Sequence, residues 1–114
     1  MVVKRAGDGT VVARGCELAD TSLKRMRGLL GRDALGAGSG LWIRPCNSVH
    51  TWFMRFPIDV IFLDSEASVV RIEPELKPWR MTRIVLSARS VLELEAGAAK
   101  RAGLKPGDRL EFGE

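Results

Sequence analysis

The segment IDVIFL, residues 58–63, constrains the fold more than any other part of the chain. If these residues form a strand, their side chains fall into two alternating rows, and both rows are apolar except at Asp59. A strand with two apolar faces is covered on both sides, so it belongs at the centre of a sheet between packing layers. The pattern therefore predicts a layered β structure built around residues 58–63.

Short apolar segments separated by turn residues extend this prediction along the chain. Further strands are expected within residues 2–14, 41–43, 49–54, 68–72, 90–95 and 109–112. The sequence Gly7-Asp8-Gly9 suits a hairpin turn within the first of these segments. Residues 73–82 contain two prolines, so we expect them to be extended but irregular. The spacing of strands and turns predicts a mainly β fold, a compact antiparallel β-sandwich or barrel.

One short α-helix is expected near the N-terminus, over residues 20–30. Leu23, Met26 and Leu30 would form its apolar stripe. Residues 31–40 contain four glycines and are expected to be a loop, either a connector or a lid beside a pocket. Residues 98–102 are expected to form a further helical turn that Gly103 ends.

The length of 114 residues predicts a single β-rich domain over residues 1–114. Cys16 and Cys46 are the two cysteines, too few for a disulfide-dependent secreted scaffold, so both are expected to be free thiols. The N-terminal sequence MVVKRAGDG has no apolar signal region, and no apolar run approaches the length of a membrane span. We therefore expect a cytoplasmic, monomeric protein without a membrane span.

The net charge of +4 and the pI of about 9.6 indicate a moderate basic excess. Much of it lies within residues 77–89, where Lys77, Arg80, Arg83 and Arg89 have no acidic neighbour. This excess permits contact with nucleic acid or with an anionic surface but requires neither.

Asp59 and His50 are the most informative polar residues. A carboxylate within an apolar strand must find hydrogen-bond donors or take up a proton. The register between the predicted strands 49–54 and 58–63 decides whether the two side chains lie on the same face. If Met54 lies opposite Ile58, Asp59 lies across from Phe53 and away from the His50 face, whereas a slip of one residue places it on that face. The sequence leaves both registers open.

The spacing Cys46-x3-His50 suggests two further kinds of site. Two metal ligands, or a nucleophile and its base, would need a turn here, because residues four apart on a strand lie about 13 Å apart. The other candidate metal ligands, Cys16, Asp59 and Asp64, have no recognised spacing. The chain also contains no phosphate-binding loop and no dinucleotide fingerprint. We therefore expect neither a metal ion nor a cofactor.

Three motifs occur in a fixed order: RGLLGR (27–32), HTWFMRFPIDVIFLD (50–64) and VLELEAGAAKRAGLKPGDRLEF (91–112). Together they resemble the domain of unknown function 192 family of bacteria and archaea, over nearly the whole chain. The resemblance implies a compact β-sandwich or barrel and brings no established activity, substrate or cofactor. Many relatives carry a leader sequence, so a secreted location also has to be considered. His50, Asp59 and Glu93 match the family pattern and are not fully explained by folding.

Three functions are compatible with these features. The first is a module that binds a small ligand or a protein in a pocket near His50 and Asp59. Its candidate ligand-binding residues are Trp52, Met54, Trp79 and Glu93. The second is a small hydrolase that uses His50 and Asp59 as an acid–base or orienting pair. The third is nucleic-acid binding through residues 77–89, with Trp79 stacking on bases.

Overall fold

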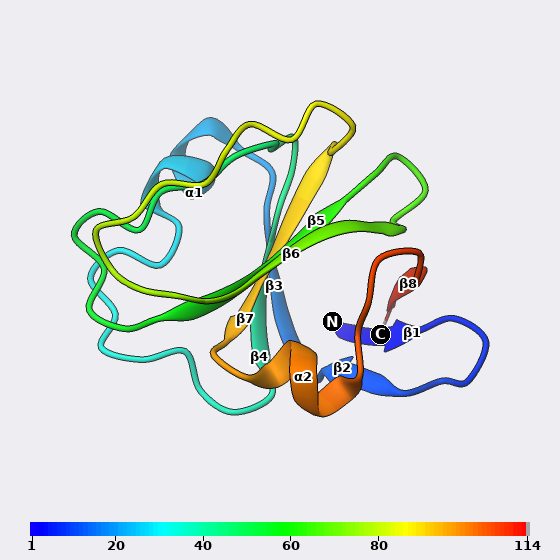
Figure 1. Cartoon of the computed structure of the whole chain (residues 1–114). Helices are drawn as coiled ribbons and strands as arrows, with labels where there is room; N and C mark the ends of the chain where they lie inside the picture. Colours follow the sequence, from blue (N-terminus) through cyan, green and yellow to red (C-terminus); the bar gives the residue numbers. More distant parts are fainter. Residues whose placement is uncertain (114) are drawn as a thin grey trace.

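The computed structural model describes residues 1–113, which form two β-sheets and two short helices (Figure 1). The larger sheet has the strand order β3 (Gly15–Ala19), β4 (Ser39–Ile43), β7 (Ser90–Glu95), β5 (Ile58–Leu63), β6 (Val69–Leu76). The smaller sheet has the order β2 (Val11–Ala13), β1 (Val2–Arg5), β8 (Leu110–Gly113). The helices are α1 (Ser22–Arg27) and α2 (Ala98–Ala102). The predicted mainly β, sandwich-like fold is confirmed.

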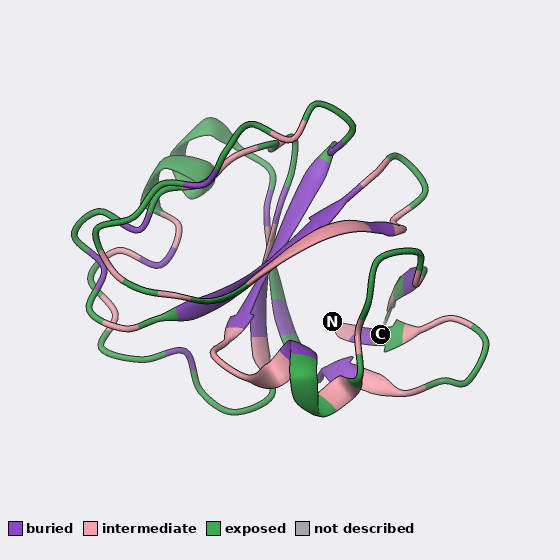
Figure 2. Ribbon diagram, viewed as in Figure 1, coloured by how far each residue is buried: buried purple, intermediate pink, exposed green. Residues whose placement is uncertain are grey.

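The strands β5 and β7 lie inside the larger sheet and are buried on both faces (Figure 2). All six residues of β5 are buried, as the two apolar rows of IDVIFL predict. On one face, Ile61 and Leu92 pack against residues of the smaller sheet and α2. On the other face, Val60 and Phe62 pack against residues of the segments around α1 and the loop after β4. Loops rather than a second sheet therefore cover this second face.

The register between β5 and β7 decides which polar residues share a face. Val60 pairs with Glu93, and Asp59 pairs with Leu94. Residues directly opposite each other in an antiparallel pair point to the same face of the sheet. Glu93 therefore lies on the face covered by loops, and Asp59 lies on the face covered by α2 and the smaller sheet.

The N-terminal helix is shorter than the predicted range of 20–30. It ends at Arg27 because Gly28 adopts a φ of 48°, outside the helical region. None of its residues is buried, so the predicted apolar stripe is wrong for Leu23 and Met26, which are exposed. Neither α1 nor α2 has the length or apolar content to cross a membrane.

The strands differ from the prediction in three places. Residues 49–54 form turns instead of a strand, with a single-residue bridge between His50 and Met81. The strand β6 continues through Pro74 to Leu76, which an edge strand tolerates because its outer side needs no N–H donor. The strand β3 was not expected, and it pairs with β4 in parallel, whereas the predicted sandwich was antiparallel throughout.

Candidate functional site

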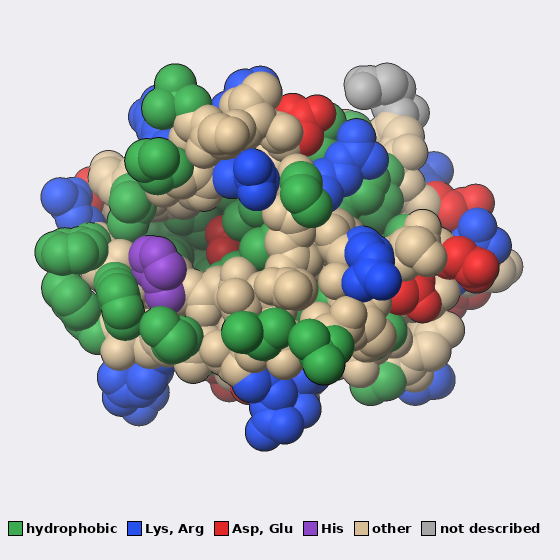
Figure 3. Space-filling view, turned by 90° about the horizontal axis from the view of Figure 1, so that it is seen from above, with side chains coloured by type: hydrophobic (Ala, Val, Ile, Leu, Met, Phe, Trp, Pro, Cys, Tyr) green, Lys and Arg blue, Asp and Glu red, His purple; other side chains and the backbone are tan. Residues whose placement is uncertain are grey.

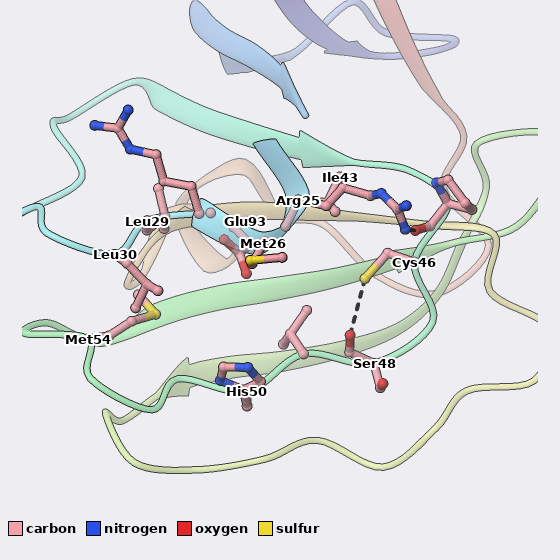
Figure 4. Close-up of a pocket in the computed structure, with 14 residues that line it drawn as sticks. Arg25, Met26, Leu29, Leu30, Ile43, Cys46, Ser48, His50, Met54 and Glu93 are labelled. Carbon is pink, nitrogen blue, oxygen red and sulfur yellow. Dashed lines mark hydrogen bonds between the residues drawn. The ribbon is translucent and has the colours of Figure 1, made fainter. Parts of the chain in front are cut away.

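A cavity of about 170 Å³ opens on the loop-covered face of the larger sheet. Its walls come from α1 with the residues after it and from the loop after β4 (Figure 4). Three sulfur-containing side chains line it, those of Met26, Cys46 and Met54. Its other apolar lining residues are Leu29, Leu30, Ile43, Pro45 and Val49. The cavity is thus mostly apolar and open to solvent on one side, where Figure 3 shows a hollow with the histidine at its rim.

Glu93 is the acidic residue of this cavity, and the strand pairing places it there. It lies on β7 between Leu41 of β4 and Val60 of β5, so its neighbours in the sheet are apolar. Its side chain is 4% exposed, and the exposed part faces the cavity (Figure 4). The alternation of Leu92, Glu93 and Leu94 was predicted correctly, but the face that holds Glu93 is buried as well.

The Glu93 carboxylate has no hydrogen-bond partner in the part of the chain that the structure describes. Burial away from water disfavours the charged form and raises the pKa of Glu93 to about 7. The group therefore changes its protonation state near neutral pH, at the floor of an open cavity.

The loop after β4 carries His50 and Met54 into the cavity wall. Thr51 holds this loop, because its Oγ1 atom donates to the Lys77 carbonyl at 2.6 Å and accepts from the Arg80 N–H at 2.9 Å. Thr51 is buried, while His50 is exposed at the rim. The structure thus brings together His50, Met54 and Glu93 of the residues singled out from the sequence.

Cys46 also lines the cavity, and it is a half-buried free thiol. Its Sγ atom donates to the Ser48 carbonyl at 3.1 Å, and burial raises the pKa of the thiol. The thiolate that a nucleophile or a metal ligand requires is therefore disfavoured. Within residues 1–113, no group of three or more His, Cys, Asp or Glu side chains is placed to hold a metal ion.

Asp59 lies away from this cavity, on the opposite face of the sheet. Its Oδ1 atom accepts hydrogen bonds from the N–H groups of Glu75 at 2.8 Å and Gly97 at 3.2 Å. Its Oδ2 atom accepts from the N–H of Ala99 at 2.9 Å. The carboxylate thereby satisfies the N-terminus of α2, which has no capping side chain of its own. Asp59 is a structural residue whose partners are all main-chain groups.

The hydrolase hypothesis required His50 and Asp59 within hydrogen-bond reach. Neither of the two registers considered from the sequence occurs, because residues 49–54 form no strand beside β5. Asp59 lies on the face of the sheet covered by α2, whereas His50 lines the cavity on the other face, so the sheet separates the two side chains. An acid–base pair of these two residues is therefore excluded by the topology of the sheet.

The two tryptophans singled out from the sequence lie outside the cavity. Trp52 packs beside the His50 ring, with ring centroids 4.9 Å apart. Trp79 packs against Phe53 at 4.7 Å, and both of these rings are largely exposed. None of these aromatic side chains lines the cavity, although Trp52 lies beside His50, which does.

Sequence reasoning missed the contribution of α1 and the residues after it. Met26 was predicted to belong to the apolar stripe of the helix, and no role was predicted for Arg25 or Leu29. All three line the cavity, and Leu29 is buried there. The glycines at positions 28 and 31 were the available signal, because they end the helix and let the chain turn over the sheet.

Comparisons with known proteins agree on the fold. A family model named DUF192 and described as "Uncharacterized ACR" matches residues 2–112. A UPF0127 protein of Pyrococcus abyssi is 35% identical over 101 residues, which cover 84% of both chains. A crystal structure of a protein of unknown function from Novosphingobium aromaticivorans is similar with a TM-score of 0.82 and 28% identity, covering 98% of this chain and 84% of that one. A second, of a candidate transcription regulator from Sinorhizobium meliloti, is similar with a TM-score of 0.80 and 27% identity, covering 96% and 91%.

Proposed function

We propose a binding function for this chain, which belongs to the domain of unknown function 192 family. Its ligand is a small molecule whose inner end donates N–H hydrogen bonds, as an ammonium group does, and whose outer end is anionic. One observation carries the proposal: Glu93 is a buried carboxylate without a donor, at the floor of an open and mostly apolar cavity.

The chemistry of the inner end of the ligand is inferred from the carboxylate of Glu93, which lacks hydrogen-bond donors. An ionised carboxylate has several acceptor sites and no donor, and leaving them unmet away from water costs several kcal/mol. Natural proteins pair buried charges, so an isolated one facing a cavity indicates a partner that arrives from outside. An ammonium group supplies both the opposite charge and the hydrogen bonds.

The size and lining of the cavity limit the body of the ligand. Its volume of about 170 Å³ is close to that of an engineered apolar cavity of ~150 Å³ that holds benzene. The buried part of the ligand is therefore about the size of a benzene ring. The thioethers of Met26 and Met54 can adapt to its shape, since methionine side chains are flexible and polarisable.

The cavity mouth favours an anionic outer end. Arg25 and Arg27 belong to the lining, and their segment of the chain contains no acidic residue between Thr21 and Arg32. A guanidinium group binds a carboxylate or phosphate with two parallel hydrogen bonds. His50 at the rim adds a further polar contact for this outer end.

Binding of 4-(aminomethyl)benzoate tests the proposal, because this probe carries an ammonium group and a carboxylate at opposite ends of one ring. Titration followed by NMR chemical shifts should show it binding at least ten times more tightly than 4-methylbenzoate, which lacks the ammonium group. The affinity should rise between pH 5 and pH 8, because the pKa of Glu93 is about 7 and the ionised form binds the ammonium group.

Two variants provide the controls for this titration. The substitution Glu93→Gln should remove the preference for the ammonium compound and its pH dependence. The same change at Glu111, an exposed residue of β8, should leave both as they are. Equal affinity for the two compounds, or an unchanged preference in Glu93→Gln, would refute the proposed role of this carboxylate.

A further inference from the structure

The charge of the molecule is strongly uneven. Residues 21–32, 41–58 and 77–92 contain ten of the 18 basic residues and none of the 14 acidic ones. We refer to these three segments as the basic end. Arg32 pairs with Glu17 and Arg55 with Asp33, but no ion pair within residues 1–113 neutralises the other eight basic side chains of this end. The remainder of the chain has an acidic excess.

The three segments of the basic end are neighbours in space. Residues 47–51 and 80–85 run side by side, joined by backbone hydrogen bonds such as Thr51 N–H to Arg80 O at 2.8 Å and Val85 N–H to Asn47 O at 2.9 Å. The side chain of Arg25 on α1 donates to the Pro45 carbonyl at 3.3 Å. Figure 1 shows α1 and these loops at the end of the molecule away from the smaller sheet.

Large apolar side chains are exposed at the same end. On α1 these are Leu23 and Met26, and in the loop after β4 they are Trp52 and Phe53. Leu23 is 75% exposed although burial would be favourable for a side chain of this size.

The third segment presents four more such side chains, Trp79, Met81, Ile84 and Leu86, and Leu86 is 82% exposed. Within residues 1–113, every large hydrophobic side chain that is exposed belongs to the basic end. Figure 3 shows apolar and basic side chains gathered around the hollow on this face. An exposed apolar surface of this kind marks a site of interaction.

The arrangement of the two residue types identifies the partner. Apolar and basic residues alternate along the chain, as in LKRMR (23–27) and WRM (79–81). Protein interfaces place charged residues at the rim and deplete them from the core. A bilayer surface can bind apolar and basic side chains that are intermixed, because the apolar side chains insert at the acyl boundary while the basic side chains bind lipid phosphates.

A nucleic acid fits these residues less well. Its phosphates would meet the basic side chains and its bases could stack on Trp79. The aliphatic side chains of Leu23, Ile84 and Leu86 would gain no burial from such a partner. We therefore propose that the basic end docks onto an anionic lipid bilayer, with its apolar side chains inserted at the headgroup level and without spanning the membrane.

Flotation of the full chain with lipid vesicles tests this proposal. The protein should bind vesicles of phosphatidylcholine and phosphatidylserine, and binding to pure phosphatidylcholine should be much weaker. Each basic side chain at a membrane surface contributes roughly fivefold in partitioning, so the triple variant Lys77→Ser, Arg80→Ser, Arg83→Ser should bind on the order of a hundredfold more weakly. Added salt should weaken binding of the unmodified chain.

A second variant and a matched control separate insertion from charge attraction. Ile84→Ser with Leu86→Ser should weaken binding to the anionic vesicles about tenfold while the net charge stays the same. The control triple variant Lys4→Ser, Arg14→Ser, Lys100→Ser removes the same charge from exposed positions outside the basic end and should bind as the unmodified chain does.

Three results would overturn the proposal. The first is equal binding to neutral and anionic vesicles. The second is a loss of binding in the control triple variant as large as that in the Lys77, Arg80 and Arg83 variant. The third is that the chain binds a single-stranded oligonucleotide but does not bind anionic vesicles. Circular dichroism of each variant confirms that a loss of binding is not a loss of folding.

Discussion

Replacing Asp59 with alanine should lower the free energy of unfolding by about 4 kcal/mol. The carboxylate accepts hydrogen bonds from three backbone N–H groups, those of Glu75, Gly97 and Ala99. Because Asp59 is 1% exposed, water cannot readily take the place of the carboxylate as acceptor. Each backbone N–H group left without an acceptor costs on the order of 1–3 kcal/mol. The loss is a large part of the ~5–15 kcal/mol that stabilises a domain of this kind.

Urea unfolding followed by circular dichroism measures this loss. Asp59→Asn keeps one acceptor oxygen and should lose roughly half as much. Asp20→Ala, at an exposed position, should change stability by no more than about 0.5 kcal/mol. If Asp59→Ala costs less than about 1 kcal/mol, the carboxylate does not hold α2 against the sheet, contrary to the fold described above.

Replacing Glu93 with leucine should have the opposite effect and stabilise the protein by roughly 3 kcal/mol at pH 8. Burial raises the pKa of Glu93 to about 7 in the folded state, from the ordinary glutamate value of 4.5 that applies in the unfolded chain. Between these two values the folded chain retains a proton that the unfolded chain has lost. Stability therefore falls as the pH rises through this window and levels off above pH 7.

The pH dependence separates this effect from any change in packing. The stabilisation by Glu93→Leu should be about 3 kcal/mol larger at pH 8 than at pH 4, as measured by urea unfolding at both values. Glu111→Leu, an exposed position on β8, controls for the general effect of removing a carboxylate. A gain from Glu93→Leu that does not vary with pH would mean that Glu93 titrates normally in the folded protein.

These two carboxylates occupy neighbouring central strands and have opposite effects on stability. Asp59 is saturated by main-chain donors and stabilises the fold, whereas Glu93 has no donor among the described residues and destabilises it. Binding sites commonly retain groups that lower stability because the ligand needs them. This contrast is the physical reason for assigning a structural role to Asp59 and a ligand-binding role to Glu93.

The sequence predicted the layers of the fold well because its strongest signals are local. The two apolar rows of residues 58–63 and the alternation within residues 90–95 each predict a strand without reference to the rest of the chain. The buried state of Asp59 was also predictable, since its neighbours on both sides are apolar.

The candidate site was harder to predict because it depends on register. Periodicity indicates that Asp59 and Glu93 lie in strands, but not that Glu93 faces the same side as Val60 while Asp59 faces α2. The prediction that Leu23, Met26 and Leu30 form a buried stripe on the helix was wrong for Leu23 and Met26, because it also depends on tertiary structure. A helical period is typical of a helix packed on a core, and here the helix ends at Arg27 and leaves Leu23 exposed.

The proposed role of Glu93 depends on the pH at which its carboxyl group loses its proton. A chain labelled with carbon-13 at the glutamate side-chain carboxyl group, with Glu93→Gln to assign the resonance, allows this one group to be followed by NMR as the pH changes. We expect the Glu93 resonance to titrate with a midpoint near pH 7 and to move to lower pH when 4-(aminomethyl)benzoate is added, because the ammonium group stabilises the ionised form. A midpoint near the ordinary value of a glutamate, unchanged by this probe, would contradict both the isolation of the carboxylate and its role in binding.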